Sequence, residues 1–190
     1  MKKVLRVVLI GSESTGKTTL CKALADLYGE PWVPEYGREY TLERYAKAGG
    51  ATELGLGEEG PWTSDEFRHI AEVQQKLENE AAEKAKQVLF CDTNAFATAI
   101  WHERYMGFRD PETDAIAAKD QVDLYLVTGN DVPFEADEIR DGENLRDWML
   151  ERFLEEIKKL RIPYEILTGS HEKRMQDAIE ILRRYGVTLP

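Results

Sequence analysis

Short runs suited to β-strands alternate along the chain with longer stretches in which apolar residues recur every three or four positions. This alternation predicts a parallel sheet whose strands are connected by amphipathic helices, so the predicted fold class is α/β. The predicted strands are Val4–Ile10, Trp32–Glu35, Val88–Cys91, Val122–Thr128 and Pro163–Leu167. The predicted helices are Thr18–Tyr28, Tyr36–Lys47, Ser64–Lys86 with Ser64 as its cap, Ala95–Met106, Glu143–Leu160 and a last helix capped by Ser170.

Two segments interrupt this pattern. Residues 49–61 contain five glycines and one proline, a composition typical of a mobile loop. Residues 130–142 are polar and irregular, and we expect them to form a lid over a ligand site. No internal repeat is visible, and residues 1–190 are predicted to form a single domain.

The charge of the chain narrows the choice of partners. It carries 25 Lys and Arg against 36 Asp and Glu, a formal net charge of −11, which argues against nucleic acid or an anionic membrane surface. The first apolar run is too short for a signal peptide or a membrane span, and Cys21 and Cys91 are interpreted as buried free thiols. A cytoplasmic location is therefore expected, while the sequence leaves the oligomeric state open.

Residues 11–18 read GSESTGKT and match the phosphate-binding pattern G-x-x-x-x-G-K-[ST]. The motif lies between a predicted strand and a predicted helix, where main-chain amides and a helix N-terminus can bind phosphate. Lys17 is expected to reach the β- and γ-phosphates of ATP, and the Thr18 hydroxyl to coordinate Mg²⁺. The predicted ATP-binding residues here are Gly11, Ser14, Thr15, Gly16, Lys17, Thr18 and Thr19. A glycine turn without a ligand is the simpler alternative.

Acidic residues at the ends of two predicted strands favour a kinase, since the sequence has no guanine-reading N-K-x-D motif. Glu35 and Asp92 should lie where the carboxyl ends of the strands border the phosphate-binding motif. Asp92 is expected to bind Mg²⁺ and Glu35 to accept the proton of a substrate hydroxyl, although either carboxylate could be the base. The alternatives are a solvated charge for Glu35 and a helix cap for Asp92.

The predicted lid and the turn after the fifth strand contain further candidates. The lid segment and the residues after it hold Asp131, Asp137, Arg140 and Arg146. Arginines there would neutralise charge on a transferred phosphoryl group while the closed lid excludes water. A charged surface loop is the alternative. Gly169 lies in a Thr-Gly-Ser turn that could pass beside the adenine ring, and it is added to the ATP-binding candidates.

The motifs resemble those of the nicotinamide riboside kinase domain of NadR-type NAD-biosynthesis proteins, within the P-loop kinase superfamily. The matching pieces are GSESTGKTTL at 11–20, PEYGREY at 34–40, IAEVQ at 70–74, CDTNAFATAIW at 91–101, DLYLVT at 123–128 and NDVPFEADEIR at 130–140. This resemblance covers nearly the whole chain. It implies transfer of the γ-phosphoryl group of ATP, with Mg²⁺, to the 5′-hydroxyl of nicotinamide riboside, which makes nicotinamide mononucleotide for NAD salvage.

The resemblance also implies roles for individual residues. Lys17 and Thr18 would handle phosphates and metal, Asp92 would act at the metal or as the base, and Arg140 would act from the lid. The implied substrate-binding residues are Glu35, Tyr36, Arg38, Asn94 and Asp137. Among the aromatic residues that could sandwich a pyridine ring, Tyr36 is preferred over Trp32, and Trp101 is interpreted as core.

Two departures from the family pattern bear on the substrate. The usual D-T-D reads Asp92-Thr93-Asn94, and the usual D-G-x-R of the lid reads DEIR at 137–140. Compared with the usual aspartate, Asn94 can still form hydrogen bonds but carries no negative charge. Another nucleoside or a small alcohol therefore stays an alternative acceptor. A non-catalytic ATP-binding regulator is a third possibility.

The combined prediction is a three-layer P-loop NTPase fold with a small-molecule nucleoside substrate. Its five-stranded parallel sheet is expected in the order 2-3-1-4-5, with helices on both faces and the lid near residues 130–142.

Overall fold

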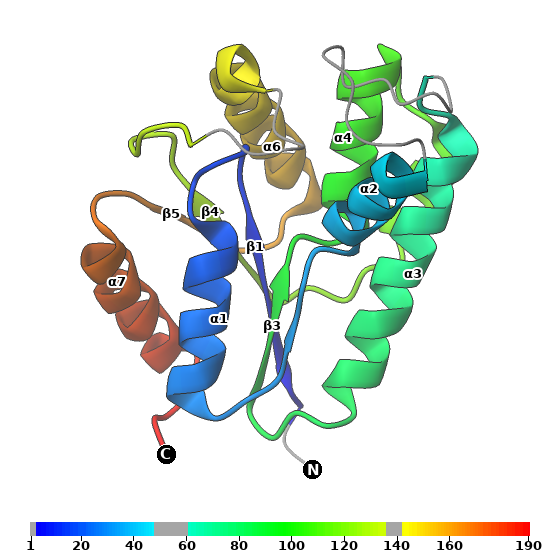
Figure 1. Ribbon diagram of the computed structural model, residues 1–190. Coiled ribbons are helices and arrows are strands. Elements are labelled where there is room, and N and C mark those ends of the chain that lie inside the picture. Colours follow the sequence, from blue (N-terminus) through cyan, green and yellow to red (C-terminus); the bar gives the residue numbers. More distant parts are fainter. Residues whose placement is uncertain (1–2, 48–60, 136–141) are drawn as a thin grey trace.

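Five parallel strands form one sheet in the order β2-β3-β1-β4-β5, as the sequence predicted. The computed structural model (Figure 1) describes residues 3–47, 61–135 and 142–190. The strands are β1 Leu5–Ile10, β2 Trp32–Val33, β3 Val88–Asp92, β4 Leu124–Thr128 and β5 Tyr164–Leu167. Parallel strands need crossover connections, which the helices between them supply.

The helices cover both faces of this sheet. They are α1 Lys17–Tyr28, α2 Tyr36–Lys47, α3 Ser64–Ala82, α4 Ala95–Met106, α5 Pro111–Ala117, α6 Arg146–Leu160 and α7 His171–Arg184, with a 3₁₀ turn at Glu143–Leu145. Figure 1 shows α1 and α7 on one side of the strands, with α3, α4 and α6 on the other. The three-layer P-loop fold predicted from the sequence is therefore confirmed.

The alternation of side chains along β1 divides the core into two clusters. Val7 and Leu9 pack with α1 and α7, whereas Val8 and Ile10 pack with α4 and α6. All four side chains are at most 1% exposed. A strand that is buried on both faces reads as a continuous apolar run, which is why the sequence predicts β1 so clearly.

The register of the strands gathers their carboxyl ends at one edge of the sheet. Leu9 is paired with Asp92 of β3, and Ile10 with Val127 of β4. The loop that follows Ile10 therefore begins between the ends of β3 and β4. Ligands of open parallel sheets bind at this edge, so the fold itself places the phosphate-binding motif where a ligand can reach it.

Several local predictions need correction. The second strand ends at Val33, so Glu35 lies in the connection to α2, and Asp92 is the last residue of β3 instead of following it. Helix α3 is capped by Thr63, not Ser64, because Thr63 and Glu66 form a reciprocal capping box. Ser170 does cap α7, as predicted.

Some predicted features fall outside the described residues. The expected mobile loop at 49–61 does so except for Pro61, and so does the central part of the expected lid, residues 136–141. Cys21 and Cys91 are buried free thiols, as expected, and burial raises the pKa of both. None of the helices in the described part of the chain has the length and apolar character needed to cross a membrane.

Helix α5 was not predicted, although its start carries a local signal. Asp110 caps it by accepting hydrogen bonds from the Thr113 amide (2.9 Å) and hydroxyl (2.7 Å), and Pro111 occupies the first turn. Arg68 of α3 donates to both carboxylate oxygens of Asp110, each at 2.8 Å. These hydrogen bonds hold the pKa of Asp110 well below its usual value, with that from Arg68 the largest cause.

We predict that D110A destabilises the protein more than D110N does. Asparagine can still cap the helix although it loses the ion pair with Arg68, whereas alanine loses both. The cap alone is worth about 1 kcal/mol, which should separate the two variants in urea denaturation at pH 7. Equal unfolding free energies for D110A and D110N would mean that Asp110 does not act as a cap.

Candidate functional site

The phosphate-binding loop has the backbone conformation that its glycines allow. Gly16, with φ +78°, precedes the first turn of α1, and no side chain caps that turn. The first amide groups of a helix have no partner within the helix, so those of α1 remain available to an anion. Gly11 has φ +154°, and a Cβ built on it would lie 2.3 Å from the Thr128 hydroxyl oxygen. Only glycine fits this approach of the loop to β4.

Hydrogen bonds fix the loop against the turn after β4. The Thr15 hydroxyl lies 2.7 Å from that of Thr128 and donates to the Ser12 carbonyl at 2.9 Å. The Ser12 hydroxyl donates to Asn130 Oδ1 at 2.5 Å. The loop is therefore rigidly seated before any ligand arrives, which lowers the cost of ordering it on binding.

A cleft of about 360 Å³ opens beside this loop. One end is formed by the loop and the first turn of α1, with Ser14, Thr15, Gly16, Lys17, Thr18 and Thr19. The opposite end is formed by α2, α3 and α4, with Trp62, Phe67, Ile70, Trp101 and Tyr105 among the lining residues. Glu35 and Arg38 also line the cleft. The cleft thus combines a polar end suited to phosphate with an aromatic end suited to a flat ring.

Lys17 and Thr18 line the polar end of the cleft, whereas Asp92 is hydrogen-bonded to Thr18 and is not among the lining residues. Lys17 Nζ donates to the Ser12 carbonyl at 2.8 Å, and the Thr18 hydroxyl donates to Asp92 Oδ2 at 2.5 Å. Asp92 is 1% exposed, and its Oδ1 has no hydrogen-bond partner among the described residues. Burial raises the pKa of Asp92, although Lys17 and the Thr18 hydrogen bond oppose the shift.

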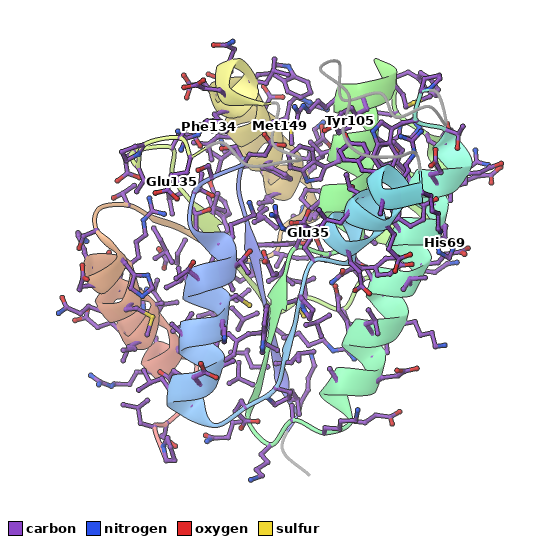
Figure 2. The ribbon with its side chains drawn as sticks, viewed as in Figure 1. Glu35, His69, Tyr105, Phe134, Glu135 and Met149 are labelled. Atoms are coloured by element: carbon purple, nitrogen blue, oxygen red, sulfur yellow. The ribbon has the colours of Figure 1, made fainter. Side chains whose placement is uncertain are left out.

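Glu35 is the second carboxylate at this edge of the sheet. Figure 2 shows it between α1 and α2, close to the upper ends of the central strands. Burial and the charge of Asp92 raise the pKa of Glu35 to about 7, while Lys17 and Arg38 oppose the increase. A carboxyl group with this pKa changes protonation near neutral pH, which suits a group that must accept a proton.

The aromatic end includes Trp101, which the sequence singled out but did not favour, and Trp62, Phe67 and Tyr105, which it did not single out as ligand contacts. The rings of Trp101 and Tyr105 are stacked with centroids 6.4 Å apart, and Trp62 lies 5.8 Å from Tyr105. Trp101 Nε1 is buried and has no hydrogen-bond partner in the described structure. Trp101, interpreted as core from the sequence, packs against two of the apolar clusters and also lines the cleft. The four-residue spacing of Trp101 and Tyr105 is a signal that could have identified this face of α4.

Glu13 joins the two ends of the cleft. Its Oε1 accepts from Arg104 Nη1 at 3.1 Å, and its Oε2 accepts from the Gly142 amide at 2.7 Å. The Arg104 guanidinium lies over the rings of Trp101 and Tyr105, at 5.0 and 4.8 Å. The phosphate-binding loop and the aromatic wall are thus held in a fixed relation.

Other predicted residues lie outside the lining of the cleft. The Tyr36 hydroxyl lies 3.3 Å from Nε2 of His69, which Figure 2 shows on the outer side of α3. Asn94 is fully buried and caps α4, with its Nδ2 bonded to Asp120 Oδ2 (2.9 Å) and to the Tyr125 hydroxyl (3.1 Å). Gly169 contacts the turn after β4 through Asp131. Asp137 and Arg140 fall outside the described residues.

Comparison with known proteins agrees with this geometry. A family model described as AAA domain matches residues 6–174. The chain belongs to this family. Along its sequence, this AAA-domain protein is 26% identical over 187 residues to the trifunctional NAD biosynthesis/regulator protein NadR of Escherichia coli (strain K12). The resemblance to NadR-type proteins is thereby confirmed.

The chain spans less than half of that relative, since the match covers 95% of this chain and 42% of NadR. Two crystal structures of NadR also match. The complex with NR has a TM-score of 0.74 at 23% identity and covers 99% of this chain and 53% of that one. The complex with NAD and AMP-PNP has a TM-score of 0.73 at 24% identity and covers 99% and 51%. Both support the P-loop fold.

We predict that N94D destabilises the protein at pH 8 by roughly 1–3 kcal/mol, because it buries a second carboxylate against Asp120. Burial already raises the pKa of Asp120 to about 6. The paired acids would take up a proton in the folded state, so the loss of stability should be present at pH 8 and shrink towards pH 5.

The exchange variant N94D/D120N is the matched control, since it restores one amide and one carboxylate. It should recover most of the stability in urea denaturation at both pH values. If N94D proved as stable as the parent protein at pH 8, the Asn94 amide would have no role in neutralising Asp120.

Proposed function

We propose that the protein transfers the γ-phosphoryl group of ATP to the 5′-hydroxyl of nicotinamide riboside. The observation that carries this proposal is the cleft, which places Glu35 together with a phosphate-binding loop at one end and an aromatic wall at the other. The likeness to NadR, a protein crystallised with NR and with an ATP analogue, supports the choice of both ligands. The cytoplasmic location expected from the sequence stays a prediction.

Each step of the proposed phosphoryl transfer is assigned to particular residues. The amides of the loop and Lys17 would hold the triphosphate, with the γ-phosphoryl group facing Glu35. The 5′-hydroxyl oxygen forms a bond to the γ-phosphorus as its proton passes to the Glu35 carboxylate. The bond from the γ-phosphorus to the β–γ bridging oxygen breaks, and ADP leaves. Arg38, which lines the cleft beside Glu35, is proposed to orient the acceptor.

Thr18 and Asp92 fit a magnesium ion. One hydroxyl and one carboxylate are the oxygen ligands that Mg²⁺ takes from a protein when phosphates and water supply the rest. The unpartnered Asp92 Oδ1, next to the Thr18–Asp92 hydrogen bond, is available to such an ion. When bound, Mg²⁺ would neutralise charge on the phosphates. The described residues contain no group of three or more His, Cys, Asp or Glu that could hold a metal ion.

The choice between the two carboxylates follows from their surroundings. Asp92 is almost inaccessible and accepts a hydrogen bond from Thr18, whereas Glu35 lines the cleft. We therefore assign the proton to Glu35 and the metal to Asp92. At the aromatic end, Trp101 and Tyr105 are proposed to contact the pyridine ring of the acceptor, because a pyridinium cation is attracted to aromatic faces. Tyr36, which the sequence favoured for this contact, does not line the cleft. It would have to contact the substrate from outside the lining residues.

The acceptor assay tests this function directly. Protein, ATP, Mg²⁺ and one acceptor from a panel of ribosides and deoxynucleosides are incubated, and the phosphorylated product is measured by chromatography. We expect nicotinamide mononucleotide to form fastest, and K17A to lose at least about a hundredfold in rate. A faster reaction with another nucleoside would identify that nucleoside as the acceptor in place of nicotinamide riboside. ATP binding without turnover would favour a non-catalytic regulator.

The pH profile tests the assignment of Glu35. The base must be deprotonated, so the rate at saturating substrates should rise as pH passes through about 7. E35Q should lose this rise, and its rate should fall by about 10²- to 10⁴-fold. D92N is the matched control, which should mainly raise the Mg²⁺ concentration needed for half-maximal rate. A parental pH profile in E35Q would exclude Glu35 as the base.

A further inference from the structure

Arg174 of α7 connects three loops at the carboxyl edge of the sheet. Its side chain is 4% exposed. Nε donates to the Gly169 carbonyl at 3.0 Å, and Nη1 to the Thr15 carbonyl at 2.5 Å. Nη2 donates to the Gly129 carbonyl at 3.2 Å and to Asp131 Oδ1 at 2.7 Å. One guanidinium thus binds the phosphate loop, the turn after β4 and the turn after β5.

Asp131 completes this arrangement from the turn after β4. While its Oδ1 accepts from Arg174, its Oδ2 accepts from the Gly169 amide at 2.5 Å. The Asp131 carboxylate therefore neutralises the guanidinium and ties the turn after β5 to the same point. A buried arginine needs such a partner, because an unpaired charge of this burial is costly.

The bond to Thr15 has a consequence inside the cleft. The peptide between Thr15 and Gly16 is planar and trans, so its carbonyl and its amide hydrogen point in opposite directions. Arg174 holds the carbonyl from outside the loop, and this fixes the Gly16 amide on the side away from Arg174. Gly16 and Thr15 both line the cleft. The orientation of a phosphate-binding amide is therefore set by a residue that the ligand does not touch.

No residue of α7 lines the cleft in the described part of the chain, whereas Arg174 is hydrogen-bonded to a loop residue, Thr15, that does line it. We propose that Arg174 is a positioning residue for the bound nucleotide, which it serves by orienting the Thr15–Gly16 peptide. It also links the phosphate end of the site to the Gly169 turn. This inference rests on one part of the proposed function, the binding of a nucleotide. It does not depend on which acceptor is phosphorylated.

The test compares R174K and R174M with the parent protein by calorimetric titration with Mg²⁺·ATP and, separately, with nicotinamide riboside. R174M removes four hydrogen bonds donated by the guanidinium, one of them to a carboxylate, and should weaken nucleotide binding roughly tenfold or more. R174K keeps the charge but loses the planar fork, so it should recover only part of the affinity. Affinity for the riboside should stay within about twofold of the parent protein, since Arg174 lies outside the cleft.

R184M is the matched control on the same helix. Arg184 forms an exposed ion pair with Glu165 at 2.8 Å, and its loss should leave both affinities unchanged. Thermal unfolding of each variant separates folding from positioning, and R174K keeps the test valid if R174M does not fold. An R174K or R174M protein that is folded and binds ATP as tightly as the parent would overturn the inference. A parent protein that binds ATP but phosphorylates no riboside would instead refute the proposed function alone.

Discussion

The packing of the phosphate loop against the end of β4 is the contact on which the site depends. The register that pairs Ile10 with Val127 brings Gly11 to Thr128, where a side chain on residue 11 could not fit. A one-residue slip of β1 would turn its buried side chains to the opposite face and remove the loop from this position. The same strand pairing thus fixes both the core and the ligand site. The interactions that stabilise the central strands also hold the phosphate loop in position.

Charge around the cleft is balanced locally, although the chain as a whole carries a net charge of −11. Arg104 is paired with Glu13, and Arg174 with Asp131. Lys17 differs, because its ammonium group donates to the neutral carbonyl of Ser12. An incoming phosphate can replace a carbonyl as partner more readily than it can displace a carboxylate. The arginines are therefore suited to hold the walls of the site, and Lys17 to meet the ligand.

The sequence predicted what depends on short motifs and on burial patterns. The five strands and the phosphate loop followed from continuous apolar runs and a specific spacing of Gly, Lys and Thr, whereas the order of the strands followed from the resemblance to P-loop kinases. Helix α5 was missed because seven residues are too few to show helical periodicity, although the Asp110-Pro111 start was visible. Thr63 was missed as the cap of α3 because Ser64, the next residue, is also a good capping residue. What distinguishes Thr63 is Glu66, which lies three residues after it and completes the capping box.

The aromatic wall as a whole could not be predicted because it is assembled from separate helices, although the spacing of Trp101 and Tyr105 marks the face of α4. Phe67 of α3 and Tyr105 of α4 have ring centroids 6.1 Å apart, and Trp62 joins them from the residues before α3. Contacts of this kind depend on how two helices pack, which residue spacing along one helix does not specify. Tyr36 was favoured through its position next to Glu35, yet Glu35 lies in the connection before α2 and Tyr36 is the first residue of that helix, so adjacency in sequence does not bring both side chains to the cleft.

The substitution of asparagine for the second aspartate of the D-T-D pattern is explained by the core behind the site. Asp120 is buried there and needs donors, which Gln75 Nε2 (2.8 Å), the Phe96 amide (3.0 Å) and Asn94 Nδ2 (2.9 Å) supply. A carboxylate at residue 94 could not donate, so this chain uses the position to neutralise an acid instead of adding one. The Asn94 side chain therefore has a structural role in the core. Of the two carboxylates that the sequence singled out, Glu35 and Asp92, only Glu35 lines the cleft.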